Sequence, residues 1–144
     1  MLIIAEGRIR SDAEGEMPAL ELFEGPLFTL ARELRSRETW PRDVALYIVT
    51  SSYGLVRADR TIRPYRRPMT PARAADAIYE NFGRLAAALA TIQPLELMLA
   101  LPEVYRRALI RKDTPQVQGV PVVYLDVEKA HVPEQLLAWL TARD

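Results

Sequence analysis

The stretch "VALYIVTSSYG", residues 44–54, decides the fold, because an apolar run of strand length ends there in a Ser-Ser-Tyr-Gly turn. Apolar and polar residues do not alternate in this run, which is typical of a strand covered on both faces. Residues 2–5, 95–101 and 121–126 form three further runs of the same kind. Residues that favour turns bound each run, so the chain is predicted to contain four strands.

Helical patterns separate these runs. Residues 26–37 carry apolar residues at the i, i+3, i+4, i+7 spacing of one helix face. A longer helix is predicted from Pro71 to about residue 91, with Thr70 as its N-cap and Pro94 after its end. Its predicted buried stripe is Ile78, Phe82, Leu85, Leu89 and Ile92. Pro102 begins a shorter helix to about residue 110, and Pro133 begins the last one, with Leu136, Leu137 and Leu140 facing inward.

The alternation of strands and helices predicts one α/β domain over residues 1–144. Right-handed crossovers would give a mostly parallel four-stranded sheet with helices on both faces, a three-layer α/β/α fold of Rossmann-like type. Ligands bind beyond the carboxyl ends of the strands in such sheets. That rule directs attention to residues 6–12, residues 50–69, Pro102–Tyr105 and Asp126–Glu128.

The composition excludes several classes of site. The chain has no cysteine and a single histidine, so structural disulfides, thiolate nucleophiles and Cys-rich or His-rich metal sites are ruled out. No phosphate-loop, dinucleotide or metal-ligand motif occurs, and no cofactor is expected. There is no apolar run of membrane-spanning length and no signal-peptide pattern, so a cytoplasmic protein without membrane contact is expected. The formal net charge of +0 argues against a uniformly basic nucleic-acid-binding surface but allows a local basic patch.

Such a patch follows the strand of residues 44–50. Arginines crowd this segment, only Asp59 opposes them, and Tyr53 and Tyr65 flank most of them. Arginine binds phosphate through two parallel donors and tyrosine stacks on bases, which suits a nucleotide or a single-stranded or flipped-out nucleic-acid base. A solvated, proline-stiffened loop explains the composition equally well. The Ser-Ser-Tyr-Gly turn either binds an anion through its backbone N–H groups or simply ends the strand. The predicted ligand-binding residues are Ser51, Ser52, Tyr53, Gly54, Arg57, Asp59, Arg63, Tyr65, Arg66 and Arg67.

Two segments, "PALELFEGPLF" at 18–28 and "LYIVTSSYGLVRADRTIRPYRRPM" at 46–69, resemble the YaaA-like family of bacterial peroxide-stress proteins and smaller uncharacterised domains. The matching positions are Ala19, Glu21, Leu22, Phe23, Gly25, Phe28, Ser51, Tyr53, Gly54, Leu55, Asp59, Ile62, Pro64, Tyr65 and Met69. The resemblance implies a uracil-DNA-glycosylase-like fold and an association with DNA or modified-base biology, including a stress or DNA-damage link. The Cys-Ser-x-x-Lys-like segment of small members is replaced here by "EGRIRSD", which puts any activity that depends on it in doubt.

Three functions follow as expectations. The first is a binding module for a nucleotide or an exposed nucleic-acid base. The second is an enzyme acting on a nucleoside or modified base, for example by N-glycosidic cleavage, with Glu6, Asp59 or Asp126 as the acid and Ser51 or Ser52 orienting the substrate. The third is a degenerate, non-catalytic member that acts through protein partners or by self-association. A cleft that holds a carboxylate close to Tyr53 would favour the enzyme.

Overall fold

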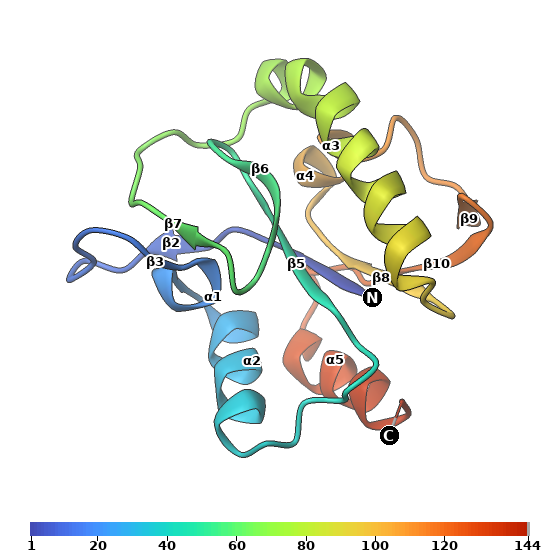
Figure 1. Ribbon diagram of the computed structural model, residues 1–144, viewed down its shortest axis with the longest axis horizontal. Coiled ribbons are helices and arrows are strands. Elements are labelled where there is room, and N and C mark those ends of the chain that lie inside the picture. Colours follow the sequence, from blue (N-terminus) through green and yellow to red (C-terminus); the bar gives the residue numbers. More distant parts are fainter. Residues whose placement is uncertain (144) are drawn as a thin grey trace.

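The four predicted strands form the parallel centre of a mixed α/β fold. The computed structural model describes residues 1–143, and the strands are β1 (Leu2–Ala5), β5 (Leu46–Thr50), β8 (Leu97–Ala100) and β10 (Val120–Tyr124). They pair in parallel in the order β5-β1-β8-β10 (Figure 1). The prediction of a mostly parallel sheet is therefore confirmed.

The sheet has six strands, so the prediction of four was wrong in number. β6 (Gly54–Arg57) pairs antiparallel with β5, and β9 (Gln116–Val117) pairs antiparallel with β10, which places one antiparallel strand at each edge. Short turns connect both hairpins; in the second, Gln118 and Gly119 have φ values of 51° and 80°, as a two-residue hairpin turn requires. Residues 54–57 continue the sheet because the turn at 51–53 reverses the chain.

Short strand pairs also organise residues 7–18 and the segment that follows β6. β2 (Arg8–Ile9) pairs with β4 (Phe23–Glu24), and β3 (Met17–Pro18) pairs with β7 (Thr61–Ile62), all antiparallel. A single helical turn, α1 (Ala19–Leu22), lies between β3 and β4. The β3–β7 pairing holds the end of residues 7–18 against the segment that follows β6.

The predicted helices are present as α2 (Pro26–Ser36), α3 (Pro71–Ile92), α4 (Glu103–Arg107) and α5 (Val132–Thr141). The Thr70 side chain accepts a hydrogen bond from the Arg73 backbone N–H at 3.2 Å, which confirms the predicted N-cap of α3. Helices α2 and α5 contact each other, as do α3 and α4, and the two pairs lie apart in Figure 1. None of the helices within residues 1–143 is both long and apolar enough to cross a membrane.

Two apolar clusters explain why the central strands do not alternate in polarity. Leu2 and Ile4 of β1 pack in one cluster with residues of α2 and α5, such as Phe28 and Leu136. Ile3 packs in the other cluster, with residues of α3 and α4 among others. Since successive strand residues point to opposite faces, both faces of β1 are covered by apolar side chains.

Two details of the helix predictions were wrong. Phe82 was placed in the buried stripe of α3 but is 37% exposed, whereas Asn81 beside it is only 1% exposed. Leu85 and Leu89 are buried as predicted, so the difference is local. Asn81 turns inward because it bridges polar backbone groups, which a pattern of apolar residues cannot indicate. Leu137 of α5 is 41% exposed, while Leu136 and Leu140 are buried as predicted.

Replacement of Gly83 by alanine is expected to stabilise the protein by about 1 kcal/mol. Gly83 lies within α3 with exposed surroundings, and a Cβ atom built there would meet no atom within 4 Å. Alanine loses less conformational freedom than glycine when a helix forms. Urea denaturation of Gly83→Ala measures the gain, with Ala87→Gly, on an exposed position of the same helix, as the opposite change. Equal or lower stability of Gly83→Ala would show that this position is constrained by something other than the helix.

Candidate functional site

The carboxylate of Glu6 connects three distant segments at the carboxyl end of the sheet. Glu6 directly follows β1, and its Oε1 accepts hydrogen bonds from the Ser51 backbone N–H at 3.0 Å and from the Tyr65 hydroxyl. Its Oε2 accepts a hydrogen bond from the Tyr105 hydroxyl at 2.7 Å. Glu6 is thus held by the turn after β5, the arginine-rich loop after β7 and helix α4 after β8.

The strand order explains why a site forms here. From β1 the chain crosses to β5 on one side, and from β5 it crosses back to β8 on the other side of β1. The order therefore reverses between β1 and β8, and open parallel sheets bind ligands at such a point, beyond the carboxyl ends of the strands. Glu6 and Tyr105 follow these two strands and meet there.

A cleft of about 780 Å³ opens at this point, a size typical of small-molecule sites. The side chains of Glu6, Tyr65 and Tyr105 line the cleft and bond to one another, and we call these three side chains the floor of the cleft. Segments 7–13 and 64–68 supply the rest of its lining. Four of the lining residues are arginines, and they define the rim of the cleft: Arg8, Arg10, Arg66 and Arg67.

The rim is positively charged, but not uniformly. Arg8 bonds to Glu24 with Nε to Oε2 at 3.0 Å, and Arg10 pairs with Asp12 at 3.1 Å. Arg66 and Arg67 are exposed and form no ion pair with any residue in 1–143. The guanidinium groups of Arg66 and Arg67 are therefore the rim donors that remain available to an anion.

The two floor tyrosines stay protonated at neutral pH. Burial is the main cause that raises the pKa of Tyr65 and of Tyr105, and their hydrogen bonds to Glu6 raise it further. Each hydroxyl has one proton, which it donates to Glu6. Within residues 1–143, no group of three His, Asp or Glu side chains is arranged to bind a metal ion.

Tyr53 supports the cleft wall rather than lining it. Its ring packs against Tyr65 with centroids 5.8 Å apart, and the Arg60 guanidinium lies 5.7 Å from the Tyr53 ring centroid. Its hydroxyl accepts a hydrogen bond from the Arg63 backbone N–H at 3.1 Å. Both rings are half-buried, and Tyr65 lines the cleft while Tyr53 does not, so the structure does not bring the two predicted stacking rings into the cleft together.

The Ser-Ser-Tyr-Gly turn has two structural connections. Ser51 bonds to Glu6, and its hydroxyl donates to the Arg67 carbonyl, which fixes the arginine-rich loop to the turn. Ser52 is exposed. Gly54 has a φ of 71°, and a Cβ atom there would lie 2.5 Å from Asn81 Oδ1, so this turn requires glycine.

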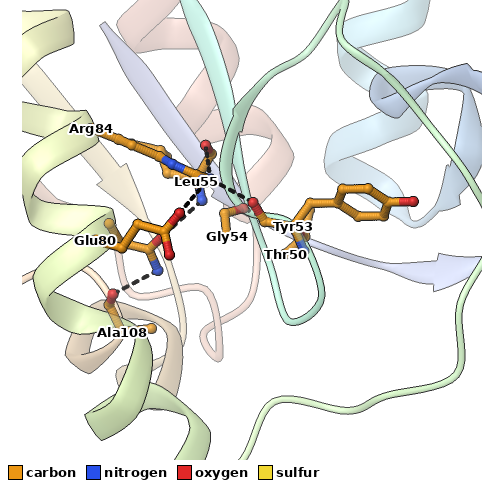
Figure 2. Close-up of polar contacts among 8 residues, drawn as sticks. Thr50, Tyr53, Gly54, Leu55, Glu80, Arg84 and Ala108 are labelled. Carbon is orange, nitrogen blue, oxygen red and sulfur yellow. Dashed lines mark hydrogen bonds and ion pairs between the residues drawn. The ribbon is translucent and has the colours of Figure 1, made fainter.

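Helix α3 anchors the same turn from the other side. Asn81 accepts from the Leu55 backbone N–H at 3.0 Å and donates to the Ala108 carbonyl at 2.9 Å. Figure 2 shows Arg84 directed toward the hairpin, where it donates to the Tyr53 carbonyl at 2.6 Å. The position of Ser51, and with it one bond to Glu6, thus depends on α3.

Other predicted site residues lie elsewhere. β6 returns antiparallel to β5, so Arg57 lies opposite Tyr47 near the amino end of the sheet, where it pairs with Asp59 at 3.3 Å. Both residues line a separate cavity of about 970 Å³. Arg63 pairs with Glu16 at 3.2 Å, and Asp126 accepts from the Glu128 backbone N–H, neither of them in the lining of the Glu6 cleft.

The Glu6 cleft also contains residues that the sequence did not predict individually as site residues. Tyr105, Arg8 and Arg10 lie in segments to which the strand-end rule pointed, but their residue types did not distinguish them from other surface residues. Gly7 is another residue of the cleft that was not predicted. The Glu24 carbonyl lies so close to Gly7 that there is no room for a side chain. The alternation of strands and helices in the sequence predicts that these segments lie at the site. Only the strand order of the structure shows which of their residues meet there.

Comparison with known proteins adds no assignment: no family model matches the chain, and no curated protein matches it. The functional argument therefore rests on the residues and geometry of the cleft.

Proposed function

We propose that the Glu6 cleft binds a nucleotide or a nucleic-acid segment, with Arg66 and Arg67 contacting phosphate. The observation that carries this proposal is the unpaired Arg66 and Arg67 beside a carboxylate and two tyrosines in one cleft. Arginine suits phosphate, and a carboxylate suits the hydroxyl or amino groups of a nucleotide. A purely anionic ligand would meet repulsion from Glu6, so a ligand with a neutral polar part as well as a phosphate is favoured.

The family and detailed fold remain part of this proposal. We infer a YaaA-like domain with a three-layer, uracil-DNA-glycosylase-like or Rossmann-like arrangement. Apolar clusters on both faces and the reversal of strand order support the arrangement. The residues of the sequence pattern support the family, since Phe23, Tyr53 and Tyr65 pack together as the aromatic wall behind the floor.

A second candidate is an enzyme that acts on a nucleoside or modified base. The carboxylate of Glu6 lies in the cleft beside Tyr65, which packs on Tyr53, and this favours Glu6 over Asp59 and Asp126 as its acidic group. Incubation with nucleosides and base-modified oligonucleotides, followed by chromatography of released bases, tests it. Release by the wild-type protein that Glu6→Gln abolishes supports an enzyme, and no release leaves the binding function alone.

The double substitution Arg66→Ala/Arg67→Ala is expected to weaken the binding of short single-stranded oligonucleotides. Each lost phosphate contact should make the slope of log K against log salt less negative by about 0.7. Fluorescence anisotropy over a salt series measures both affinity and slope. Arg42→Ala/Arg57→Ala removes the same charge at the cavity near the amino end of the sheet and is expected to change the slope little. Equal losses in the two double variants would assign the effect to overall charge, and no wild-type binding to oligonucleotides or mononucleotides at low salt would overturn the proposal.

A further inference from the structure

The floor of the cleft offers hydrogen-bond acceptors only. The Tyr65 and Tyr105 hydroxyls each donate their single proton to Glu6, so the oxygens that remain can only accept. The raised pKa values of both tyrosines keep these protons in place. A ligand must therefore bring O–H or N–H donors to the floor.

The rim of the cleft has the opposite polarity. Arginine side chains have five N–H donors and no acceptor. The side chains of Arg66 and Arg67 thus favour an anionic group at the rim, one residue along the chain from Tyr65 of the floor.

We propose that the cleft recognises the sugar and phosphate of a ribonucleotide: the ribose hydroxyls donate to Glu6 and Tyr105, and the phosphate binds Arg66 and Arg67. This inference deepens the proposed nucleotide-binding function and depends on it. It assigns the selectivity of the site to the sugar rather than to the base.

The spacing of the acceptors favours neighbouring hydroxyls. Glu6 Oε2 and the Tyr105 hydroxyl oxygen lie 2.7 Å apart, so two donors on adjacent atoms reach both oxygens side by side. The two N–H bonds of a single amino group diverge and do not fit so close a pair. The phosphate of a nucleotide is attached to the sugar, which matches a rim that directly adjoins the floor.

The surroundings of Tyr53 are consistent with recognition that does not depend on the base. The Tyr53 ring packs against Tyr65, the Arg60 guanidinium lies 5.7 Å from the Tyr53 ring centroid, and the Tyr53 hydroxyl is bonded to the backbone of residue 63. Tyr53 makes these contacts within the protein and is absent from the lining of the cleft, so a ligand in the cleft does not stack on it. We expect adenine, cytosine and uracil ribonucleotides to bind with affinities within a few-fold of one another.

Isothermal titration with adenosine monophosphate and its 2′-deoxy and 2′,3′-dideoxy analogues tests the inference. Loss of a hydrogen bond to a charged acceptor is expected to weaken binding by about tenfold or more for the dideoxy analogue. Tyr105→Phe keeps the ring but removes one acceptor, and it should reduce the discrimination between the analogues while phosphate-dependent binding persists. Tyr79→Phe, which alters an exposed tyrosine on α3, is the matched control and should leave the discrimination unchanged.

The outcomes separate this inference from the proposed function. Equal affinities for the ribose and dideoxyribose forms would overturn sugar recognition and leave phosphate binding by the arginines intact. Binding of guanine nucleotides alone, in both sugar forms, would also overturn it and assign Glu6 to the base. If the protein bound no nucleotide at all, the proposed function itself would be overturned. Short oligoribonucleotides, tested beside the free monophosphates, show whether the sugar comes from a free nucleotide or from an RNA strand.

Discussion

Replacement of Asn81 by alanine is expected to destabilise the protein by about 4 kcal/mol. Asn81 is 1% exposed, and its amide links the Leu55 N–H of β6 to the Ala108 carbonyl after α4. Alanine would leave both backbone groups buried without these bonds, and an unsatisfied buried group costs about 1–3 kcal/mol. The smaller side chain also leaves a cavity, which adds to the loss.

Chemical denaturation of Asn81→Ala measures this effect, and two further variants define its cause. Thr91→Ala removes an exposed side-chain bond to the Ala87 carbonyl on the same helix and should cost well under 1 kcal/mol. Asn81→Asp keeps the acceptor for Leu55 but loses the donor to Ala108 when ionised. Burial raises the pKa of such a carboxyl, and its protonated form can donate again, so the stability of Asn81→Asp should rise as the pH falls. A loss below 1 kcal/mol for Asn81→Ala would show that water replaces the amide.

Replacement of Gly7 by alanine is expected to cost about 3 kcal/mol and to weaken ligand binding as well. A Cβ atom at Gly7 would lie 2.1 Å from the Glu24 carbonyl oxygen, which belongs to the backbone of β4 and cannot rotate away. The pairing of β2 with β4 would have to open. Because Glu6 precedes Gly7, its bonds to Ser51 and Tyr105 would be displaced at the same time.

Thermal unfolding and nucleotide titration of Gly7→Ala measure the two effects together. Gly83→Ala is the matched control, since it adds the same methyl group where nothing is near. If Gly7→Ala retained full stability and full affinity, the close approach of Gly7 to β4 would not constrain the site. Loss of stability with unchanged affinity would separate the strand contact from the position of Glu6.

The sequence predicts the parallel centre of the fold well, because burial on both faces leaves runs such as "LIIA" and "LELMLAL" with few polar residues. The start of α3 at Thr70 and Pro71 is predicted equally well, because helix capping depends on residues that are adjacent in sequence. β6 escapes prediction because Gly54 and Arg57 are unusual for a strand and because its pairing depends on the turn before it. The burial of Asn81 was not predicted for a different reason. A buried amide is recognisable only when its two backbone partners are known.

The predicted site residues fall into two groups in the structure. Ser51, Tyr65, Arg66 and Arg67 were chosen from composition and do meet at the Glu6 cleft. Arg57 and Asp59 come from the same segment but lie near the other end of the sheet, because β6 reverses direction. Proximity in sequence therefore suggested a single patch, whereas the strand order shows two. Tyr105 joins the site from about a hundred residues beyond Glu6, a relation that only the pairing of β1 with β8 reveals.

The position of β1 between β5 and β8 has a consequence for the order of folding. Leu2 is opposite Leu46 on one side and Met98 on the other, so the first strand of the sheet needs partners that follow it at large sequence separation. The β5–β6 hairpin, by contrast, closes through a local turn. Non-local parallel pairing slows folding, and during synthesis the apolar residues of β1 emerge long before β8. The strand that places Glu6 is therefore expected to dock late, so the cleft would be among the last features of the protein to assemble.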